Sequence, residues 1–254
     1  MRFKEKNAVV TGAAAGFGEA IAMRFASEGA KVVVADIDEA GGKRVVGAIT
    51  GAGGRAVFTR TDVSSATDVK GMIDTAVTQF GGLDILVNNA GFSHRMMPLW
   101  ELPEEEYERV FATNVRGVFL GCKYAVPVMQ GRGGGVIINT ASIGAVAPRP
   151  WVTAYNSTKG AVVVMTRGLA VEVAPFRIRV NAVNPVAAET GFMKGAIGLE
   201  KLPDEARQQL AAQIPLGRLA EPSDVAAAVL FLASDDAAFL TGVCLAVDGG
   251  RSIS

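Results

Sequence analysis

A glycine-rich turn near the N-terminus constrains the fold more than any other feature of the sequence. Residues 7–10 form a short apolar run typical of a buried strand, and the turn TGAAAGFG follows directly at residues 11–18. Apolar residues then recur at helical spacing through residues 21–26, and residues 31–35 form a second strand of the buried type. Strand, glycine turn, helix and strand make a βαβ unit, which indicates the α/β class.

The turn has the chemistry of an anion-binding loop. Glycine has no side chain to block a ligand, and a loop that opens a helix directs backbone N–H groups and the positive helix end at an anion such as a pyrophosphate. The spacing is G-x-x-x-G-x-G rather than the commoner G-x-G-x-x-G. A glycine cluster alone is often only a tight turn, but the flanking strand and helix favour nucleotide binding.

Asp36 follows the second strand and bears on the choice of nucleotide. A carboxylate at this place can accept hydrogen bonds from both ribose hydroxyls of an adenosine, and it would repel a 2′-phosphate. Ile37 and Asp38 come next, and the glycine loop carries no basic residue. The sequence therefore predicts NAD rather than NADP, unless Asp36 merely ends a strand. Lys43 and Arg44 are expected to lie farther along the next helix.

The alternation of strands and helices continues to the C-terminus. Further strands are expected at residues 55–60, 83–87, 136–140, 177–182 and 242–247, and helices at 41–49, 69–80, 104–123, 155–174 and 221–233. In open parallel sheets, ligands bind beyond the carboxyl ends of the strands. The residues expected on that rim are Gly12, Asp36, Asn88 and Ser142. Residues 191–215 have weak strand character and mixed polarity, and they are interpreted as a substrate lid.

Tyr155 and Lys159 are spaced to share one face of a helix. A free phenol has a pKa of about 10 and is a poor base at neutral pH, but a nearby cation lowers that pKa. Such a pair could donate and accept a proton near neutral pH. Tyrosine and lysine at this spacing also occur on ordinary solvated helix faces, so the pair needs support from other motifs.

Composition argues against several other classes of protein. The chain has 254 residues, half of them hydrophobic, and no linker divides it, so a single domain of residues 1–254 is expected. The net charge of zero argues against a nucleic-acid partner, and no apolar run reaches the roughly 20 residues of a membrane span. The charged N-terminus argues against a signal peptide. The sequence has no Cys/His cluster with the spacing of metal ligands, so no metal site is predicted. Cys122 and Cys244 are expected to be free thiols in a cytoplasmic protein.

With these features in order, the chain resembles the short-chain dehydrogenase/reductase family over essentially its whole length. The matching motifs are Thr11-Gly12-x-x-x-Gly16-x-Gly18, Asp62, Asn88-Asn89-Ala90-Gly91, Asn114, Ser142, Tyr155-x-x-x-Lys159, Asn184-Pro185, Thr190 and Val247-Asp248-Gly249-Gly250. The resemblance implies a single-domain, Rossmann-type doubly wound sheet of seven parallel strands with helices on both faces. It also implies a homotetramer.

The resemblance further implies a catalytic tetrad of Asn114, Ser142, Tyr155 and Lys159. The tyrosine would be the general acid/base, and the serine hydroxyl would hold the substrate oxygen. The lysine would lower the tyrosine pKa and bind the nicotinamide ribose, while the asparagine carbonyl would hold a water. Asn88 would border the cofactor together with the implied cofactor-binding set of Gly12, Ala15, Phe17, Gly18, Asp36, Ile37, Asp62, Val63, Asn89, Ala90, Gly91, Tyr155, Lys159, Pro185, Val186, Ala188 and Thr190.

The substrate pocket is harder to define. Val186 departs from the family pattern, which commonly has glycine after the proline, and it adds a side chain near the nicotinamide face. The candidate substrate residues are Ser142, His94, Trp151, Tyr155, Val186, Phe192 and Met193. Most are apolar, which suggests a ring or alkyl ketone rather than a polyol. A lone loop histidine is more often a packing residue, but with Arg95 or Arg149 it could meet an acidic substrate.

The predicted activity is reversible hydride transfer between NAD and a secondary alcohol or ketone, in the class EC 1.1.1.-. One alternative is a reductase of 3-oxoacyl groups on an acyl-carrier protein, which usually prefers NADPH and needs a basic docking patch. The other alternative is a non-catalytic nucleotide-binding scaffold, against which the intact Tyr/Lys pair argues.

Overall fold

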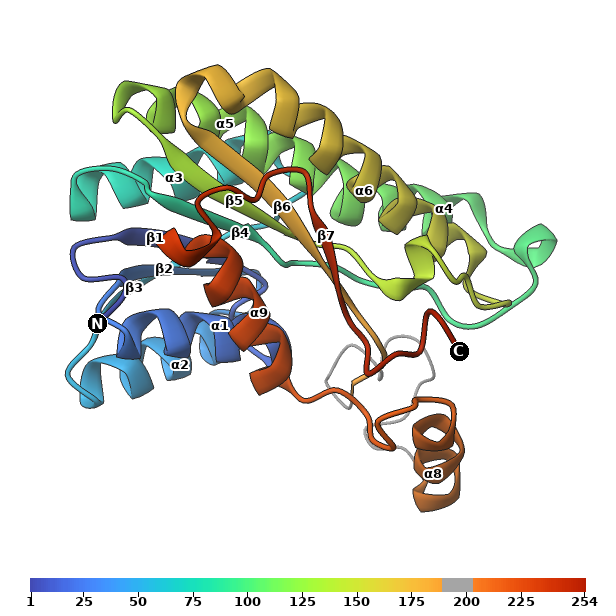
Figure 1. Cartoon of the computed structure of the whole chain (residues 1–254). Helices are drawn as coiled ribbons and strands as arrows, with labels where there is room; N and C mark the ends of the chain where they lie inside the picture. Colours follow the sequence, from blue (N-terminus) through green and yellow to red (C-terminus); the bar gives the residue numbers. More distant parts are fainter. Residues whose placement is uncertain (189–202) are drawn as a thin grey trace.

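The computed structural model describes residues 1–188 and 203–254. Its strands are Asn7–Thr11 (β1), Lys31–Asp36 (β2), Arg55–Arg60 (β3), Ile85–Asn88 (β4), Gly135–Thr140 (β5), Ile178–Pro185 (β6) and Cys244–Val247 (β7). All neighbours pair in parallel, and the order is β3-β2-β1-β4-β5-β6-β7 (Figure 1). The seven-stranded doubly wound sheet expected from the resemblance is therefore confirmed.

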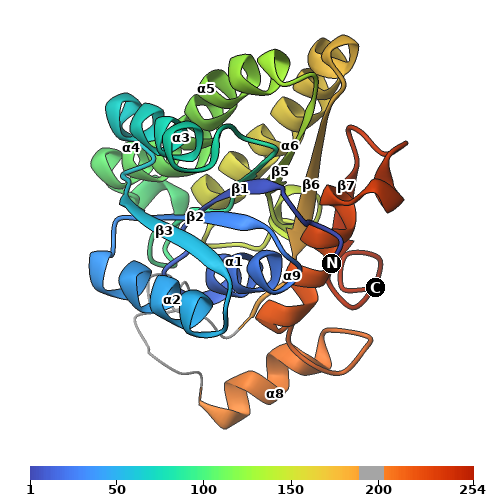
Figure 2. The same ribbon diagram turned by 90° about the vertical axis from the view of Figure 1, so that its left-hand side faces the viewer.

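Helices cover both faces of the sheet (Figures 1 and 2). One layer consists of Gly16–Ser27 (α1), Glu39–Gly51 (α2) and Pro222–Ala233 (α9), and the other of Ala66–Phe80 (α3), Glu104–Phe111 (α4), Gly117–Gly131 (α5) and Thr153–Val173 (α6). Asp204–Ala212 (α8) stands apart from both layers (Figure 1). Short 3₁₀ helices occur at Leu99–Glu101 (η1), Ile143–Ala145 (η3), Ala174–Phe176 (η4) and Asp235–Ala237 (η5). No described helix is both long and apolar enough to cross a bilayer.

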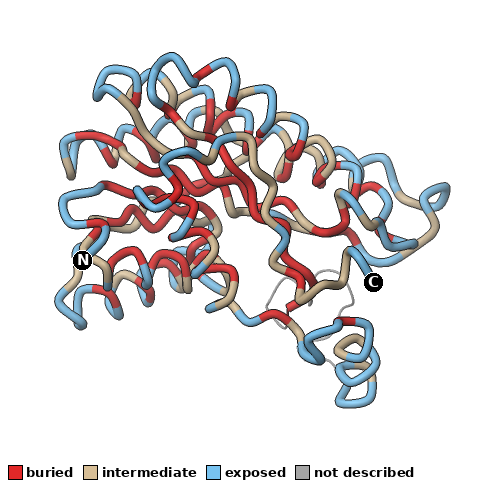
Figure 3. Tube along the Cα trace, viewed as in Figure 1, coloured by how far each residue is buried: buried red, intermediate tan, exposed pale blue. Residues whose placement is uncertain are grey.

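The central strands contribute side chains to two apolar cores, one on each face of the sheet. On β1, Ala8 and Val10 pack in the core formed with α1, α2 and α9, whereas Val9 packs in the core formed with α3, α5 and α6. Successive side chains of a strand point to opposite faces, so a strand covered on both faces must be apolar throughout. This explains why β1, β2 and β4 are continuous apolar runs, and why the middle of the sheet is buried (Figure 3).

Two segments differ from the expectations drawn from the sequence. The long helix expected from residue 104 is interrupted by a π-helical turn at Ala112–Arg116 (η2), which joins α4 to α5. Such turns are uncommon and are often found at functional sites. The segment interpreted as a lid is described from residue 203 onward, and there it forms α8 rather than strand-like chain. Its lid role stays a prediction.

Phe25 offers a test of the α1 core. It is fully buried, and its ring packs edge-to-face against Phe3 with 4.9 Å between the centroids. Phe25→Ala should lower the free energy of unfolding by about 3–5 kcal/mol, because it leaves a cavity that the packed core cannot close. Phe25→Leu keeps most of the apolar volume and should cost only about 1 kcal/mol. Urea denaturation measures both losses, and equal losses would contradict this packing argument.

Candidate active site

A cavity of about 660 Å³ opens at the carboxyl ends of the strands. Its size lies within the range of about 300–1,000 Å³ that is usual for small-molecule sites. It is lined by the loops after β1, β2, β4, β5 and β6 and by the start of α6. The strand order reverses between β1 and β4, so the cavity lies where doubly wound sheets bind their ligands.

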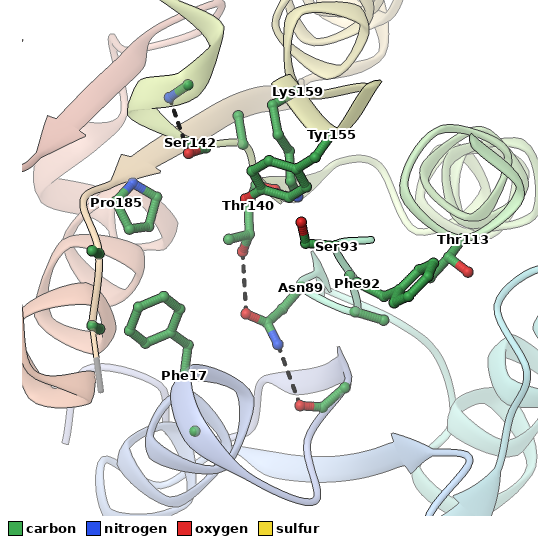
Figure 4. A pocket seen from close by; sticks show the side chains of 18 of the residues that line it. Phe17, Asn89, Phe92, Ser93, Thr113, Thr140, Ser142, Tyr155, Lys159 and Pro185 are labelled. Atoms are coloured by element: carbon green, nitrogen blue, oxygen red, sulfur yellow. Dashed lines mark hydrogen bonds between the residues drawn. The ribbon is translucent and has the colours of Figure 1, made fainter. Parts of the chain in front are cut away.

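Side chains at the ends of three strands hold the rim together (Figure 4). The N–H groups of Asn89 and Ala90 donate to the Thr11 hydroxyl oxygen at 2.9 and 3.0 Å. The Asn89 amide donates to the carbonyl oxygen of Thr11 at 3.0 Å, and its own oxygen accepts from the Thr140 hydroxyl at 3.3 Å. The Asn89 amide therefore ties the turn after β4 to the ends of β1 and β5.

Asn88 has a different role from its neighbour. It is buried, and its side chain donates to the Asn139 amide oxygen at 2.9 Å, inside the sheet and away from the cavity. Consecutive residues of a strand point to opposite faces. The expectation that Asn88 borders the cofactor is therefore corrected by this inward orientation.

Close backbone contacts explain two of the loop glycines. Gly12 has a φ of +63°, and a Cβ there would lie 2.8 Å from the Ala90 Cα. A Cβ on Gly18 would overlap the carbonyl oxygen of Gly12. Gly18 does not line the cavity. The structure thus shows a packing role for Gly18 between α1 and the loop, and its contact with the cofactor stays a prediction.

The cavity end formed by the glycine loop, the start of α1 and Asp36 fits the pyrophosphate and ribose of a dinucleotide. Helix α1 begins without a side-chain cap at Ala15, and Ala15, Gly16 and Phe17 line the cavity, so first-turn N–H groups remain available to an anion. The Asp36 carboxylate accepts from the backbone N–H of Ala14 at 2.8 Å and from that of Asp38 at 2.9 Å. These bonds fix a negative charge where an adenosine ribose would lie.

Arg44 lies nearer to the glycine loop than its position along α2 suggested. Its guanidinium donates to the carbonyl oxygen of Ala14 at 2.9 Å and pairs with the Glu19 carboxylate at 2.6 and 2.7 Å. The positive charge is thus balanced by Glu19, and the side chain braces the loop.

Lys159 and Tyr155 come from the first two turns of α6 and face the cavity (Figure 4). The Lys159 ammonium donates to the carbonyl oxygen of Thr140 at 2.8 Å and lies 5.6 Å from the centroid of the Tyr155 ring. Burial lowers the pKa of Lys159 to about 8. The pair therefore belongs to a buried cluster and not to a solvated helix face.

Burial also raises the pKa of Tyr155 above its ordinary value, while a hydrogen bond with Ser142 and the charge of Arg149 act in the opposite direction. The sequence predicted that Lys159 lowers this pKa, and that role of the lysine stays a prediction.

Asn114 lies behind the cavity wall. It is completely buried in the π turn, and its side chain exchanges two hydrogen bonds of 2.9 Å with the backbone of Phe92. It also donates to the Thr158 hydroxyl at 3.1 Å. A Cβ on Gly91 would lie 3.3 Å from the Asn114 oxygen and 3.4 Å from the Lys159 ammonium. Asn114 thus fixes the backbone beside Lys159 and does not itself line the cavity.

Comparisons with known proteins agree with this geometry. A family model described as enoyl-(acyl carrier protein) reductase matches residues 12–252. The chain is 47% identical over 253 residues to 4-formylbenzenesulfonate dehydrogenase of Comamonas testosteroni, with 100% of both chains covered. The chain belongs to the short-chain dehydrogenase/reductase family. It is also 43% identical to cis-4-hydroxycyclohexanecarboxylate dehydrogenase of Sinomonas cyclohexanicum, with 98% of this chain and 97% of that protein covered.

A solved structure supports the same assignment. The crystal structure of 3-ketoacyl-(acyl-carrier-protein) reductase from Brucella melitensis, complexed with NADH, matches with a TM-score of 0.92 and 44% identity. The match covers 99% of this chain and 100% of that one. This short-chain dehydrogenase/reductase is therefore an oxidoreductase, as the sequence motifs predicted.

The remaining predicted residues of this family member divide into three groups. Those that line the cavity are Ala15, Phe17, Ile37, Asp62, Val63, Asn89, Ala90, Gly91, Pro185, Val186 and Ala188. Thr190, Phe192 and Met193 lie outside the described residues. His94 and Trp151 are described but do not line the cavity. The His94 imidazole is buried, with Nδ1 2.6 Å from the carbonyl oxygen of Arg95, and the Trp151 carbonyl oxygen accepts from the Met97 N–H at 2.9 Å. The substrate roles of His94 and Trp151 stay predictions.

The sequence reasoning missed Thr140, which links the two halves of this dehydrogenase site. Its hydroxyl donates to Asn89, and its carbonyl oxygen accepts from Lys159. A hydroxyl residue at the last position of an apolar strand was the available signal. No group of three or more His, Cys, Asp or Glu side chains within the described residues could hold a metal ion.

The burial of Lys159 predicts an unusual effect on stability. Its pKa falls from 10.5 to about 8 on folding, so the unfolded chain binds the proton more tightly and stability rises with pH between these values. Each pKa unit is worth about 1.4 kcal/mol, and the lost bond to Thr140 costs about 1 kcal/mol. Lys159→Met should therefore stabilise the cofactor-free protein by about 2 kcal/mol at pH 7.

Chemical denaturation at pH 7 and at pH 10.5 measures this effect, since 10.5 is the ordinary pKa of the lysine. The difference in stability between variant and wild type should shrink at the higher pH. A variant that is less stable than the wild type at both pH values would contradict the burial argument.

Proposed function

We propose that the protein catalyses reversible hydride transfer between NAD and a secondary alcohol or ketone, with Tyr155 as the general acid/base. The observation that carries the proposal is the grouping of Tyr155, Ser142 and Lys159 in the wall of one cavity. The other end of that cavity carries Asp36 and the open N-terminus of α1. A scaffold that only binds nucleotide has no need of such a buried proton-transfer cluster.

When bound, NAD supplies the hydride acceptor for oxidation and, once reduced, the hydride donor for reduction. The hydroxyls of Ser142 and Tyr155 hold the substrate oxygen between them. This positioning keeps the reacting atoms of substrate and coenzyme within the roughly 3–3.5 Å that the reaction requires. Because burial raises its pKa, Tyr155 is protonated at neutral pH and can donate to a carbonyl oxygen. Oxidation needs the phenolate, so alkaline pH favours that direction. In this proposal Lys159 would hold the nicotinamide ribose.

The preference for NAD over NADP rests on charge. Asp36 is fixed by two backbone N–H groups where it would repel a 2′-phosphate. Arg44 donates to the loop, but its charge is paired with that of Glu19. The Brucella melitensis protein was crystallised with NADH, which supports the same preference.

The substrate we propose is a ring alcohol. The cavity includes Ile143, Val186 and Ile214, which belong to a third apolar cluster, so an apolar ring has a matching wall. Val186 is nine-tenths buried in this cluster and narrows the cavity where the family commonly has glycine. The two named relatives act on 4-formylbenzenesulfonate and on cis-4-hydroxycyclohexanecarboxylate, both of them six-membered rings that carry an acid group.

A second candidate is the reduction of 3-ketoacyl groups on an acyl-carrier protein. The name of the Brucella melitensis structure, at 44% identity, favours it. A panel of ring alcohols and of 3-ketoacyl thioesters, followed at the NADH absorbance, decides between the two candidates.

Tyr155→Phe tests the proposed acid/base. Turnover of a ring alcohol should fall by about 10²- to 10⁴-fold, because the hydroxyl that moves the proton is gone. NADH affinity, measured by fluorescence, should stay within about threefold of wild type, since the ring is kept. Tyr107→Phe, at an exposed tyrosine on α4, is the matched control and should keep full activity. Full activity of Tyr155→Phe would disprove the assignment.

Asp36→Asn tests the coenzyme preference. Removing the charge should raise the ratio of kcat/KM for NADPH to that for NADH by about 10- to 100-fold, because like charges facing each other cost several kcal/mol. Steady-state kinetics with both coenzymes gives the ratio. If the ratio does not move, another group must discriminate between the two coenzymes.

A further inference from the structure

Among the residues that the structure describes, one cation in the cavity wall has no partner. The cavity is lined by four basic residues, namely Arg109, Arg149, Lys159 and Arg251. The lysine donates to a backbone carbonyl oxygen, as described above. The Arg109 guanidinium lies over the Phe92 ring, 4.4 Å from its centroid, and Arg251 donates to the Gln213 amide oxygen at 3.4 Å. Within residues 1–188 and 203–254, the Arg149 guanidinium makes no hydrogen bond or ion pair.

The backbone at Arg149 is anchored to the turn of α6 that carries the acid/base. The Arg149 carbonyl oxygen accepts from the buried Asn156 amide at 2.8 Å, and Asn156 directly follows Tyr155 on the helix. Pro148 and Pro150 restrict the backbone on either side. The base of the side chain is therefore held in place, while the exposed guanidinium is free to turn toward a ligand.

The Arg149 charge also reaches the reacting group. It lowers the pKa of Tyr155, as the hydrogen bond with Ser142 also does. The aspartates that line the cavity lie at or after the ends of β2 and β3, at the dinucleotide end described above. Within the described part of the chain, no acidic residue is paired with Arg149. An unbalanced guanidinium beside an apolar wall favours a ligand that brings a negative charge.

We infer that Arg149 binds the acid group of the substrate, and that the substrate is a ring alcohol bearing a carboxylate or sulfonate. A guanidinium presents parallel N–H donors that match the oxygens of either group. An acid group across the ring from the reacting carbon can meet Arg149 while the hydroxyl faces Tyr155 and Ser142. This inference rests on the proposed function and adds to it the residue that selects the substrate class.

The test compares a charged with a neutral alcohol, cis-4-hydroxycyclohexanecarboxylate with cis-4-methylcyclohexanol, both oxidised with NAD. Wild type should prefer the acid. Arg149→Gln should lower kcat/KM for the acid by about 10- to 100-fold, mainly through KM, and change the neutral alcohol by less than about threefold. Arg149→Lys keeps the charge without the paired donors and should recover part of the loss.

Arg95→Gln removes an exposed charge that does not line the cavity, so it should affect neither alcohol. Equal losses for both alcohols in Arg149→Gln, or a larger loss for the acid in Arg95→Gln, would overturn the inference. Oxidation of the neutral alcohol in preference to the acid by wild type would also overturn it, while the proposed function would stand.

A binding measurement separates failure of the inference from failure of the proposed function. Calorimetry of cyclohexanecarboxylate with the enzyme–NADH complex should show binding by wild type that weakens by at least about tenfold in Arg149→Gln. If wild type oxidises no alcohol, the proposed function fails and this comparison alone decides the inference. Equal affinity in the two proteins, or no binding by wild type, would overturn it.

Discussion

The close approach of two backbones, Gly12 against Ala90, is the constraint on which the cavity depends. Two strand ends that meet this closely exclude water, so their N–H and carbonyl groups must bond to protein. The Thr11 hydroxyl and the Asn89 amide provide these bonds. Through Thr140 the same network continues to Lys159. The coenzyme loop and the proton-transfer cluster are therefore held at a fixed distance by side chains that perform no chemistry themselves.

Burial gives the cluster its chemistry at a cost in stability. A buried ammonium with a single carbonyl partner is poorly solvated, which is why its pKa falls. The same exclusion of water raises the pKa of Tyr155, so burial disfavours the charged form of both groups. Such conflict between local stability and site chemistry is common at functional sites.

The sequence predicted the fold well because its signals are local. Strands buried on both faces must be continuous apolar runs, and the helices between them repeat at helical spacing. It predicted the site less well because the missing facts depend on three-dimensional contacts. The opposite orientations of Asn88 and Asn89 follow from strand alternation once the end of β4 is known. The sequence placed that end at residue 87, whereas β4 ends at Asn88. The π turn at Asn114 has no local signal, since the Phe92 backbone that stabilises it comes from another loop.

The cavity also has an electrostatic direction that the neutral net charge of the chain conceals. Asp36, Asp38 and Asp62 line the end beside β2 and β3, whereas the unpartnered Arg149 lies beside α6. Under the proposed function, the acidic end would disfavour an additional phosphate on the coenzyme, and the basic end would favour an acid group on the substrate. Selection of both ligands can thus reside in a few side chains set on a scaffold shared with many other enzymes.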